Sequence, residues 1–182
     1  MALTLLLGGA AAGKSRLAVR LAAAWGDPVV VIATAEPRDE EMAERIRRHR
    51  EQRPPEWRTV EEPVDLEAAL ASVPHEAQAL VDCLTLWVSN LVELGLSDED
   101  VEDRARKAAS LAASRTSGTV AVTNEVGSGV VPVNSLARRY RDLLGRVNAI
   151  WAEAADRVGL VVAGRVLPLS GPEALLGGVD GG

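Results

Sequence analysis

Apolar and polar positions alternate in blocks along this chain. Short, predominantly apolar runs, most of them rich in Val and Leu, occur at residues 3–7, 29–33, 79–84, 119–123 and 159–164. Apolar runs of this length are typical of strands covered on both faces. Helices are predicted between them, because apolar residues recur at three- and four-residue spacing over residues 14–25, 38–53, 98–115 and 134–157. The alternation predicts an α/β fold around a mostly parallel sheet.

Length and composition set the scale of this fold. The 182 residues, 47% of them hydrophobic, suffice for one good core, so a single domain spanning residues 1–182 is expected. No repeat of 20 to 50 residues is present. The Gly- and Pro-containing end, "LPLSGPEALLGGVDGG", predicts a loosely ordered tail from about residue 168.

The charge balance narrows the classes of partner. A net charge of −6 and a pI near 5.0 oppose broad binding to nucleic acid or anionic membranes, and 3% aromatic residues leave few stacking platforms for bases. Cys83 is the sole cysteine, so no internal disulfide can form. No apolar run reaches membrane-spanning length, and the N-terminal run lacks a signal peptide's positive start, so a cytoplasmic protein is expected.

The first apolar run leads directly into "GGAAAGKS", residues 8–15, which fits the phosphate-binding pattern Gly, any four residues, Gly, Lys, Ser. Glycines let successive backbone N–H groups turn toward a phosphate, and the following helix N-terminus adds a favourable field. Lys14 would reach the β and γ phosphates and the Ser15 hydroxyl would ligate Mg²⁺. An accidental small-residue turn is the alternative. The predicted nucleotide-binding residues are Gly8, Gly9, Ala10, Ala11, Ala12, Gly13, Lys14 and Ser15.

Asp82 lies late in the apolar run "ALVDCL". A buried carboxylate is costly without a partner, and a Mg²⁺ ion beside the phosphate-binding loop would supply one. The alternative is a structural Asp that caps the helix expected over "TLWVSNLVEL". Asp82 and Ser15 are therefore the candidate metal ligands, and the sequence leaves the alternative open.

The segment "RIRRHREQRP", residues 45–54, carries five arginines and His49, one of only two histidines. It belongs to a predicted helix from Asp39 to Arg53, with acids in its first turn as the helix dipole favours. The i,i+4 pairs Glu41–Arg45 and Glu44–Arg48 predict surface ion pairs, whereas Arg47, Arg50 and Arg53 are left without such acids. Met42, Ile46 and His49 share one helical face, so His49 is predicted to point inward, as either a structural or a catalytic residue.

The motifs taken together resemble those of a known family. The segments "GGAAAGKSR", "IATAEPRDEEMAERIRRHREQRP", "WRTVEEP", "VDCLTLWVSNL", "VTNEVGSGVVP" and "LARRYRDLLGRVN" are similar, in order, to the motifs of the bifunctional adenosylcobinamide kinase/adenosylcobinamide-phosphate guanylyltransferase family of cobalamin biosynthesis. The resemblance covers residues 3 to 163. It implies a P-loop NTPase of RecA-like fold, commonly a homotrimer, that phosphorylates the corrinoid adenosylcobinamide with GTP or ATP and then transfers GMP from GTP to the new phosphate.

The resemblance also implies roles for particular residues. The second reaction would proceed through a guanylylated His49, with nearby arginines offsetting phosphoryl charge. Further nucleotide-site positions implied by the match are Thr34, Ala35, Glu36, Arg50, Glu51, Gln52, Arg53, Glu61 and Asp82. Glu61 has the alternative of a solvated loop acid. Asn124 and Glu125 end the fourth apolar run, where α/β sheets bind ligands, so substrate or base contacts are expected there. His75 matches no motif and is expected to be exposed.

Two positions depart from the family pattern, in which the loop usually reads Gly-Gly-x-Arg-Ser-Gly-Lys-Ser. Here Ala11 and Ala12 replace the Arg and Ser, which puts nucleotide affinity or the efficiency of the kinase step in question. Many relatives carry Glu where this chain has Asp82, a change that a hard cation tolerates. Other readings are a simple P-loop kinase without a covalent intermediate, a GTP-binding switch or assembly module, and a nucleic-acid binder, which the acidic balance disfavours.

Overall fold

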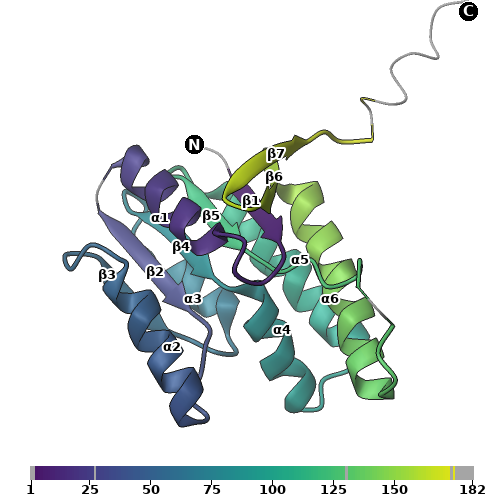
Figure 1. Ribbon diagram of the computed structural model, residues 1–182. Coiled ribbons are helices and arrows are strands. Elements are labelled where there is room, and N and C mark those ends of the chain that lie inside the picture. The colour runs from purple at the N-terminus through teal and green to yellow at the C-terminus, as the bar shows by residue number, and fades with distance from the viewer. Residues whose placement is uncertain (1–2, 27, 130, 173, 175–182) are drawn as a thin grey trace, which may run out of the picture.

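A seven-stranded sheet organises the molecule (Figure 1). The computed structural model describes residues 3–26, 28–129, 131–172 and 174. The strands, in chain order, are β1 (Leu3–Gly8), β2 (Val29–Ala33), β3 (Arg58–Glu61), β4 (Gln78–Asp82), β5 (Thr119–Val122), β6 (Arg157–Val162) and β7 (Arg165–Leu169). Their spatial order is β3-β2-β4-β5-β1-β6-β7, and every neighbouring pair is parallel except β6 and β7. The predicted α/β class with a mostly parallel sheet is confirmed.

The helices form two layers on this sheet. They are α1 (Lys14–Trp25), α2 (Glu40–Glu51), α3 (Leu66–Ser72), α4 (Leu84–Glu93), α5 (Asp98–Ser114) and α6 (Ser135–Ala154). Helix α1 packs on one face, where Ala18 and Ala22 contact a core that includes Leu6 and Val120. Helices α3 to α6 pack on the other face, in a larger core with fully buried Trp87 and Trp151. Apolar side chains on both faces explain why the strands read as continuous apolar runs.

Three elements were not predicted. Strand β3, "RTVE", is four residues long with no buried residue, and helix α3 has only seven residues, so neither gives a strong periodic signal. Strand β7 contains Pro168, which an edge strand tolerates, and all five of its residues are exposed. The expected tail from about residue 168 is wrong at its start, because Pro168 and Leu169 pair with β6; residues 173 and 175–182 lie outside the described part of the chain.

Helix α2 differs from the other long helices because it buries no residue completely. Figure 1 shows it at the end of the sheet that carries β2 and β3, away from α5 and α6. Asp39 caps its N-terminus by accepting a hydrogen bond from the Met42 N–H at 2.6 Å. A helix that touches the sheet with only a few half-buried side chains leaves space beneath it, and the predicted site lies there.

No helix in the described part of the chain is long and apolar enough to cross a membrane.

Candidate active site

Three strand ends meet at one edge of the sheet. Register aligns Leu6 of β1 and Asp82 of β4 with Val122 of β5, which lies between these two strands. Parallel strands bring their carboxyl ends together, so the loop after β1 and the Asp82 carboxylate become neighbours although 67 positions separate Ser15 from Asp82. The Ser15 hydroxyl donates a hydrogen bond to Asp82 Oδ1 at 3.3 Å.

The glycine-rich loop has the backbone that phosphate binding requires. A Cβ atom on Gly8 would lie 2.3 Å from the carbonyl oxygen of Val161, so only glycine fits there. Gly13 has a positive φ of 99° and precedes α1, whose N-terminus no described side chain caps. Its first N–H groups are therefore available to an anion. Gly164, in the turn between β6 and β7, donates its N–H to Ala12 O at 2.9 Å and supports the loop from behind.

Lys14 is folded back over this loop. Its ammonium donates to the carbonyl oxygens of Gly8 at 2.9 Å and Gly9 at 2.6 Å, and the residue is 7% exposed. Burial lowers the pKa of Lys14, while Asp82 opposes that shift and Arg45 adds to it. A nucleotide phosphate would take the place of the two carbonyl acceptors.

The Asp82 carboxylate contacts side chains from both sides of the site. Its Oδ2 accepts a hydrogen bond from the Arg53 guanidinium at 3.0 Å and lies 3.6 Å from His49 Nδ1. Burial alone would raise the pKa of Asp82, but His49 and Arg53 together hold it below its ordinary value, so the carboxylate is ionised. The capping alternative is wrong: the N-cap of α4 is Cys83, and within the described chain no side chain caps that helix.

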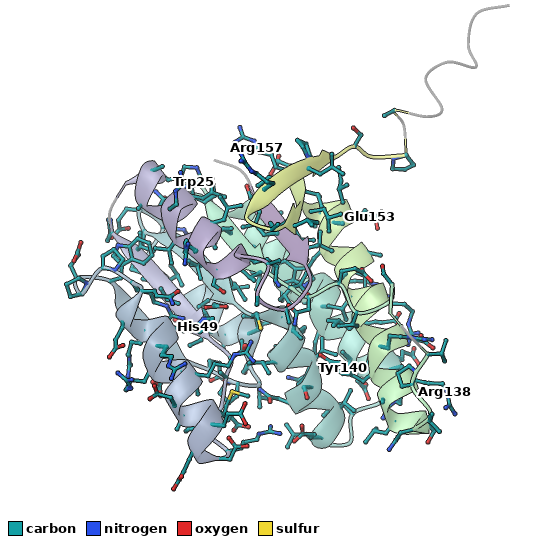
Figure 2. The ribbon with its side chains drawn as sticks, viewed as in Figure 1. Trp25, His49, Arg138, Tyr140, Glu153 and Arg157 are labelled. Carbon is teal, nitrogen blue, oxygen red and sulfur yellow. The ribbon has the colours of Figure 1, made fainter. Side chains whose placement is uncertain are left out.

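Beneath α2 lies a cavity of about 830 Å³. Its walls are the loop from Ala10 to Arg16, the carboxyl ends of the strands, and one stripe of α2. The stripe consists of Met42, Arg45, Ile46 and His49, at the i, i+3, i+4, i+7 spacing of a single helical face. Arg50 also reaches the wall, as do Gln52 and Arg53, which follow the helix. The prediction that His49 points inward is confirmed, and Figure 2 shows it on α2. Its side chain remains 34% exposed, which leaves it open to a ligand.

The arginine pairing differs from the sequence prediction. The three arginines that lack an acid four residues before them find other acidic partners: Arg47 contacts Glu44 and Glu51, Arg50 donates to Glu61 at 3.1 Å, and Arg53 pairs with Asp82. The Glu44–Arg48 pair is confirmed at 2.7 Å. The expected Glu41–Arg45 pair is not formed: Arg45 lines the cavity and has no ion-pair partner among the described residues. The 42–45–46–49 spacing was the signal that could have placed Arg45 there.

The remaining predicted residues are divided between the cavity and its surroundings. Ala35 lines the cavity. The buried Thr34 hydroxyl instead accepts a hydrogen bond from the Cys83 N–H at 2.9 Å and donates one to the Cys83 carbonyl oxygen at 2.6 Å. Glu36 bonds to Arg38, and the carboxylates of Glu51 and Glu61 are turned to arginines of α2. Their contacts with a nucleotide stay predictions. His75 is exposed, as predicted.

Asn124, at which ligand contacts are expected, is held by a polar network that the sequence did not predict. The Asn124 N–H donates to Thr85 Oγ1 at 2.7 Å, and its carbonyl accepts from Asn148 Nδ2 at 3.0 Å. Asn124 lines the cavity, while the Glu125 carboxylate turns to the Gly127 N–H. The backbone of Asn124 is thus fixed by hydrogen bonds. Its side-chain carboxamide has no hydrogen-bond partner in the described part of the chain, so it is available to a ligand in the cavity.

Nucleophiles at this cavity are few. Burial raises the pKa of the Cys83 thiol to about 11, so it stays protonated at neutral pH and is a poor nucleophile. The imidazole of His49 carries a ring nitrogen, Nε2, on the side away from Asp82. Within the described residues no cluster of three or more His, Cys, Asp or Glu side chains could hold a metal ion by itself. Ser15 Oγ and Asp82 Oδ1 suit instead a Mg²⁺ ion whose other ligands are phosphate and water oxygens.

These features define a P-loop nucleotide-binding protein of RecA-like fold. They are strand β1, the glycine-rich turn with Lys14 and Ser15, and the Asp82 carboxylate two strands away. A solved structure described as a prototypical ATPase from the type III secretion system of pathogenic bacteria superposes with a TM-score of 0.53 and 11% identity. The match covers 98% of this chain and 54% of that one, and at this identity it concerns the fold alone.

Sequence comparison identifies the family. The family model described as cobinamide kinase / cobinamide phosphate guanyltransferase matches residues 4–169. The bifunctional adenosylcobalamin biosynthesis protein CobP of Pseudomonas aeruginosa is 48% identical over 92% of this chain and 96% of its own. The proteins named CobU of Escherichia coli and Salmonella typhimurium are 41% and 38% identical, each over 88% of this chain and 95% of theirs. The chain belongs to the cobinamide kinase / cobinamide phosphate guanyltransferase family.

Proposed function

We propose that this protein phosphorylates adenosylcobinamide with a nucleoside triphosphate and then transfers GMP from GTP to the product, giving adenosylcobinamide-GDP and pyrophosphate. Family membership supports both activities. The observation that carries the proposal is that the phosphate-binding loop and His49 line the same cavity, so one nucleotide site serves both reactions.

In the kinase step, the backbone N–H groups of the loop and the Lys14 ammonium hold the β and γ phosphates. The hydroxyl of the aminopropanol arm attacks the γ-phosphorus, the bond to the bridging oxygen breaks, the nucleoside diphosphate leaves, and the hydroxyl proton passes to water. Mg²⁺ held at Ser15 and Asp82 would neutralise charge on the phosphate oxygens when bound. GTP and ATP both fit this role as donor.

In the guanylyltransferase step, His49 is the nucleophile. Nε2 of the neutral imidazole attacks the α-phosphorus of GTP, and pyrophosphate leaves, so an N–P bond replaces a P–O bond. The phosphate oxygen of the acceptor then attacks the same phosphorus, the N–P bond breaks, and His49 is regenerated. Asp82, 3.6 Å from Nδ1, orients the ring for this attack.

Four finer features belong to the same proposal. The acceptor is a corrinoid, Mg²⁺ accompanies the nucleotide, and the protein works in the cytoplasm as a homotrimer. The resemblance to the family supports the corrinoid and the homotrimer, the contact of Ser15 with Asp82 supports Mg²⁺, and a role in cobalamin biosynthesis supports the cytoplasm. The acidic composition fits a chain that binds no nucleic acid.

The test is incubation with Mg²⁺ and GTP labelled at the α-phosphate, followed by denaturation. Label is expected on the native chain and on His75→Ala, whose position is exposed and distant in sequence, but not on His49→Ala. The bond should resist alkali and break in acid, as a phosphoramidate does. If GTP binds and no chain is labelled, the guanylyltransferase half of the proposal fails and a simple kinase remains. Binding and hydrolysis without transfer to adenosylcobinamide would favour a GTP-dependent switch instead.

A further inference from the structure

One guanidinium on α2 has no carboxylate partner among the described residues, whereas its neighbours are neutralised. Of the five arginines between residues 45 and 53, four are paired with carboxylates: Arg47 and Arg48 with Glu44, Arg50 with Glu61, and Arg53 with Asp82. The fifth, Arg45, lines the cavity. Carboxylates therefore neutralise the other arginines of this segment, but the Arg45 guanidinium, which lines the cavity, has none beside it among the described residues.

The position of Arg45 relative to the reacting groups is informative. It precedes His49 by four residues, one helical turn, so the two side chains lie on the same face of α2. It is also close enough to Lys14 for its charge to act on that ammonium. Arg45 thus lines the same cavity as the histidine that would take up the α-phosphate and the lysine that would hold the β and γ phosphates.

We infer that Arg45 is a catalytic residue for guanylyl transfer, binding the α-phosphate and the bridging oxygen of GTP while His49 attacks. This inference rests on the proposed function and adds a role to the same site. Charge moves onto the bridging oxygen as the P–O bond breaks and pyrophosphate forms. A guanidinium presents two parallel N–H donors to such oxygens, and in a half-enclosed cavity it stabilises the developing charge more than it does the bound ground state.

Arg16 also lines the cavity without an ion pair among the described residues, but it does not fit this role. It lies on α1 immediately after the loop, beside the triphosphate site and not on the helix that carries His49. Arg45 and His49 belong to the same helix, one turn apart, so α2 itself sets the spacing between the nucleophile and the cation.

The experiment measures the rate of His49 labelling from α-labelled GTP at saturating concentration in Arg45→Ala, Arg45→Lys and Arg48→Ala. Arg48 is the matched control: it lies on the same helix and is exposed, as Arg45 is, but it does not line the cavity and is paired with Glu44. Arg45→Ala is expected to label about 100-fold more slowly, with a smaller change in GTP affinity. Arg45→Lys is expected to recover part of the rate, because lysine keeps the positive charge but lacks the two parallel N–H donors of the guanidinium. Arg48→Ala is expected to stay within about twofold of the native rate, because exposed pairs contribute little.

The outcomes separate this inference from the proposed function. If the native chain is labelled and Arg45→Ala is labelled at a similar rate, the inference is wrong and the proposed function stands. If Arg48→Ala slows as much as Arg45→Ala, the effect belongs to the net charge of α2, which also overturns it. If the native chain takes no label, the guanylyltransferase proposal fails and this one fails with it. Arg45 makes no ion pair with the described residues, so its variants are expected to fold, and their unfolding temperatures check this.

Discussion

Arg53 and Asp82 form an ion pair of 3.0 Å in which each side chain is only 9% exposed. This pair connects the segment that follows α2 to the end of β4. Arg53→Ala leaves a buried carboxylate with only Ser15 and His49 beside it among the described residues. We expect a loss of about 3 kcal/mol in the free energy of unfolding, because removing one partner of a buried pair leaves an uncompensated charge. Urea denaturation measures it.

Arg48→Ala is the control for that prediction. Arg48 also pairs with a carboxylate, but the pair is exposed, and exposed pairs contribute little. Equal stability losses in the two variants would mean that Arg53 contributes only a positive charge. The prediction that its buried ion pair with Asp82 stabilises the fold would then be wrong.

Gly8 is expected to be indispensable for a steric reason. In Gly8→Ala the new Cβ would meet the Val161 carbonyl oxygen at 2.3 Å, and that oxygen belongs to the neighbouring strand and cannot move aside. We expect a loss of about 1–3 kcal/mol or more from overpacking, together with weaker nucleotide binding as the loop shifts. Gly9→Ala is the matched control, since apart from Gly9 itself and its two neighbours in the chain no described atom lies within 4 Å of the position that its methyl group would take. Thermal unfolding and GTP titration of both variants test the difference, and equal behaviour would contradict it.

The sequence predicted those features of the site that depend on local pattern. The apolar runs predicted five strands correctly. The 42–46–49 spacing predicted that His49 points inward, because side-chain direction in a helix follows from its 3.6-residue period. The glycine-rich loop was recognisable because its chemistry occupies consecutive residues, 8–15. Strands β3 and β7 escaped prediction because they are short or exposed and depend on their neighbours for order.

The connections between distant segments could not be predicted in this way. Arg53 and Asp82 are 29 positions apart, and Gly164 supports Ala12 from the opposite end of the chain. Such contacts depend on strand order, which periodicity does not encode. Arg45 was misassigned for a related reason: a local i,i+4 acid offered a surface pair, but the residue belongs to the stripe that faces the cavity. That cavity exists only once α2 is placed against the sheet.

Asp98 connects α5 to α6 by accepting hydrogen bonds from Arg139 at 2.7 Å and Arg146 at 2.6 Å. The hydrogen bond from Arg139, with help from Arg146, holds the pKa of Asp98 below its ordinary value. A carboxyl with a lowered folded pKa stabilises the protein above its unfolded pKa and loses that contribution as the pH falls through the folded value. Since the side chain is 38% exposed, solvent screening limits the contribution to about 1 kcal/mol or less.

Asp98→Asn is therefore expected to be slightly less stable than the native chain at neutral and at mildly acidic pH, with the difference shrinking below about pH 4. Urea denaturation at each pH measures this. Asp142→Asn is the comparison, because Asp142 bonds only to its neighbour Arg141 among the described residues and is 54% exposed. A stability difference for Asp98→Asn that stays constant into strong acid would assign its effect to packing instead of to the charge of the carboxylate.

Ala11 tests the departure of the loop from its family pattern. Its backbone has φ 57°, a conformation that costs alanine and arginine alike, and the residue is exposed at the cavity mouth. Ala11→Arg restores the positive charge that the resemblance associates with this position. We expect GTP binding to tighten by up to about fivefold, the scale of an exposed charge interaction, and the gain to disappear in high salt. Ala24→Arg, at the far end of α1, adds the same charge away from the loop and is expected to leave affinity unchanged. If both variants gain equally, the benefit comes from reducing the net charge of −6, and the alanine at position 11 is not what limits nucleotide affinity.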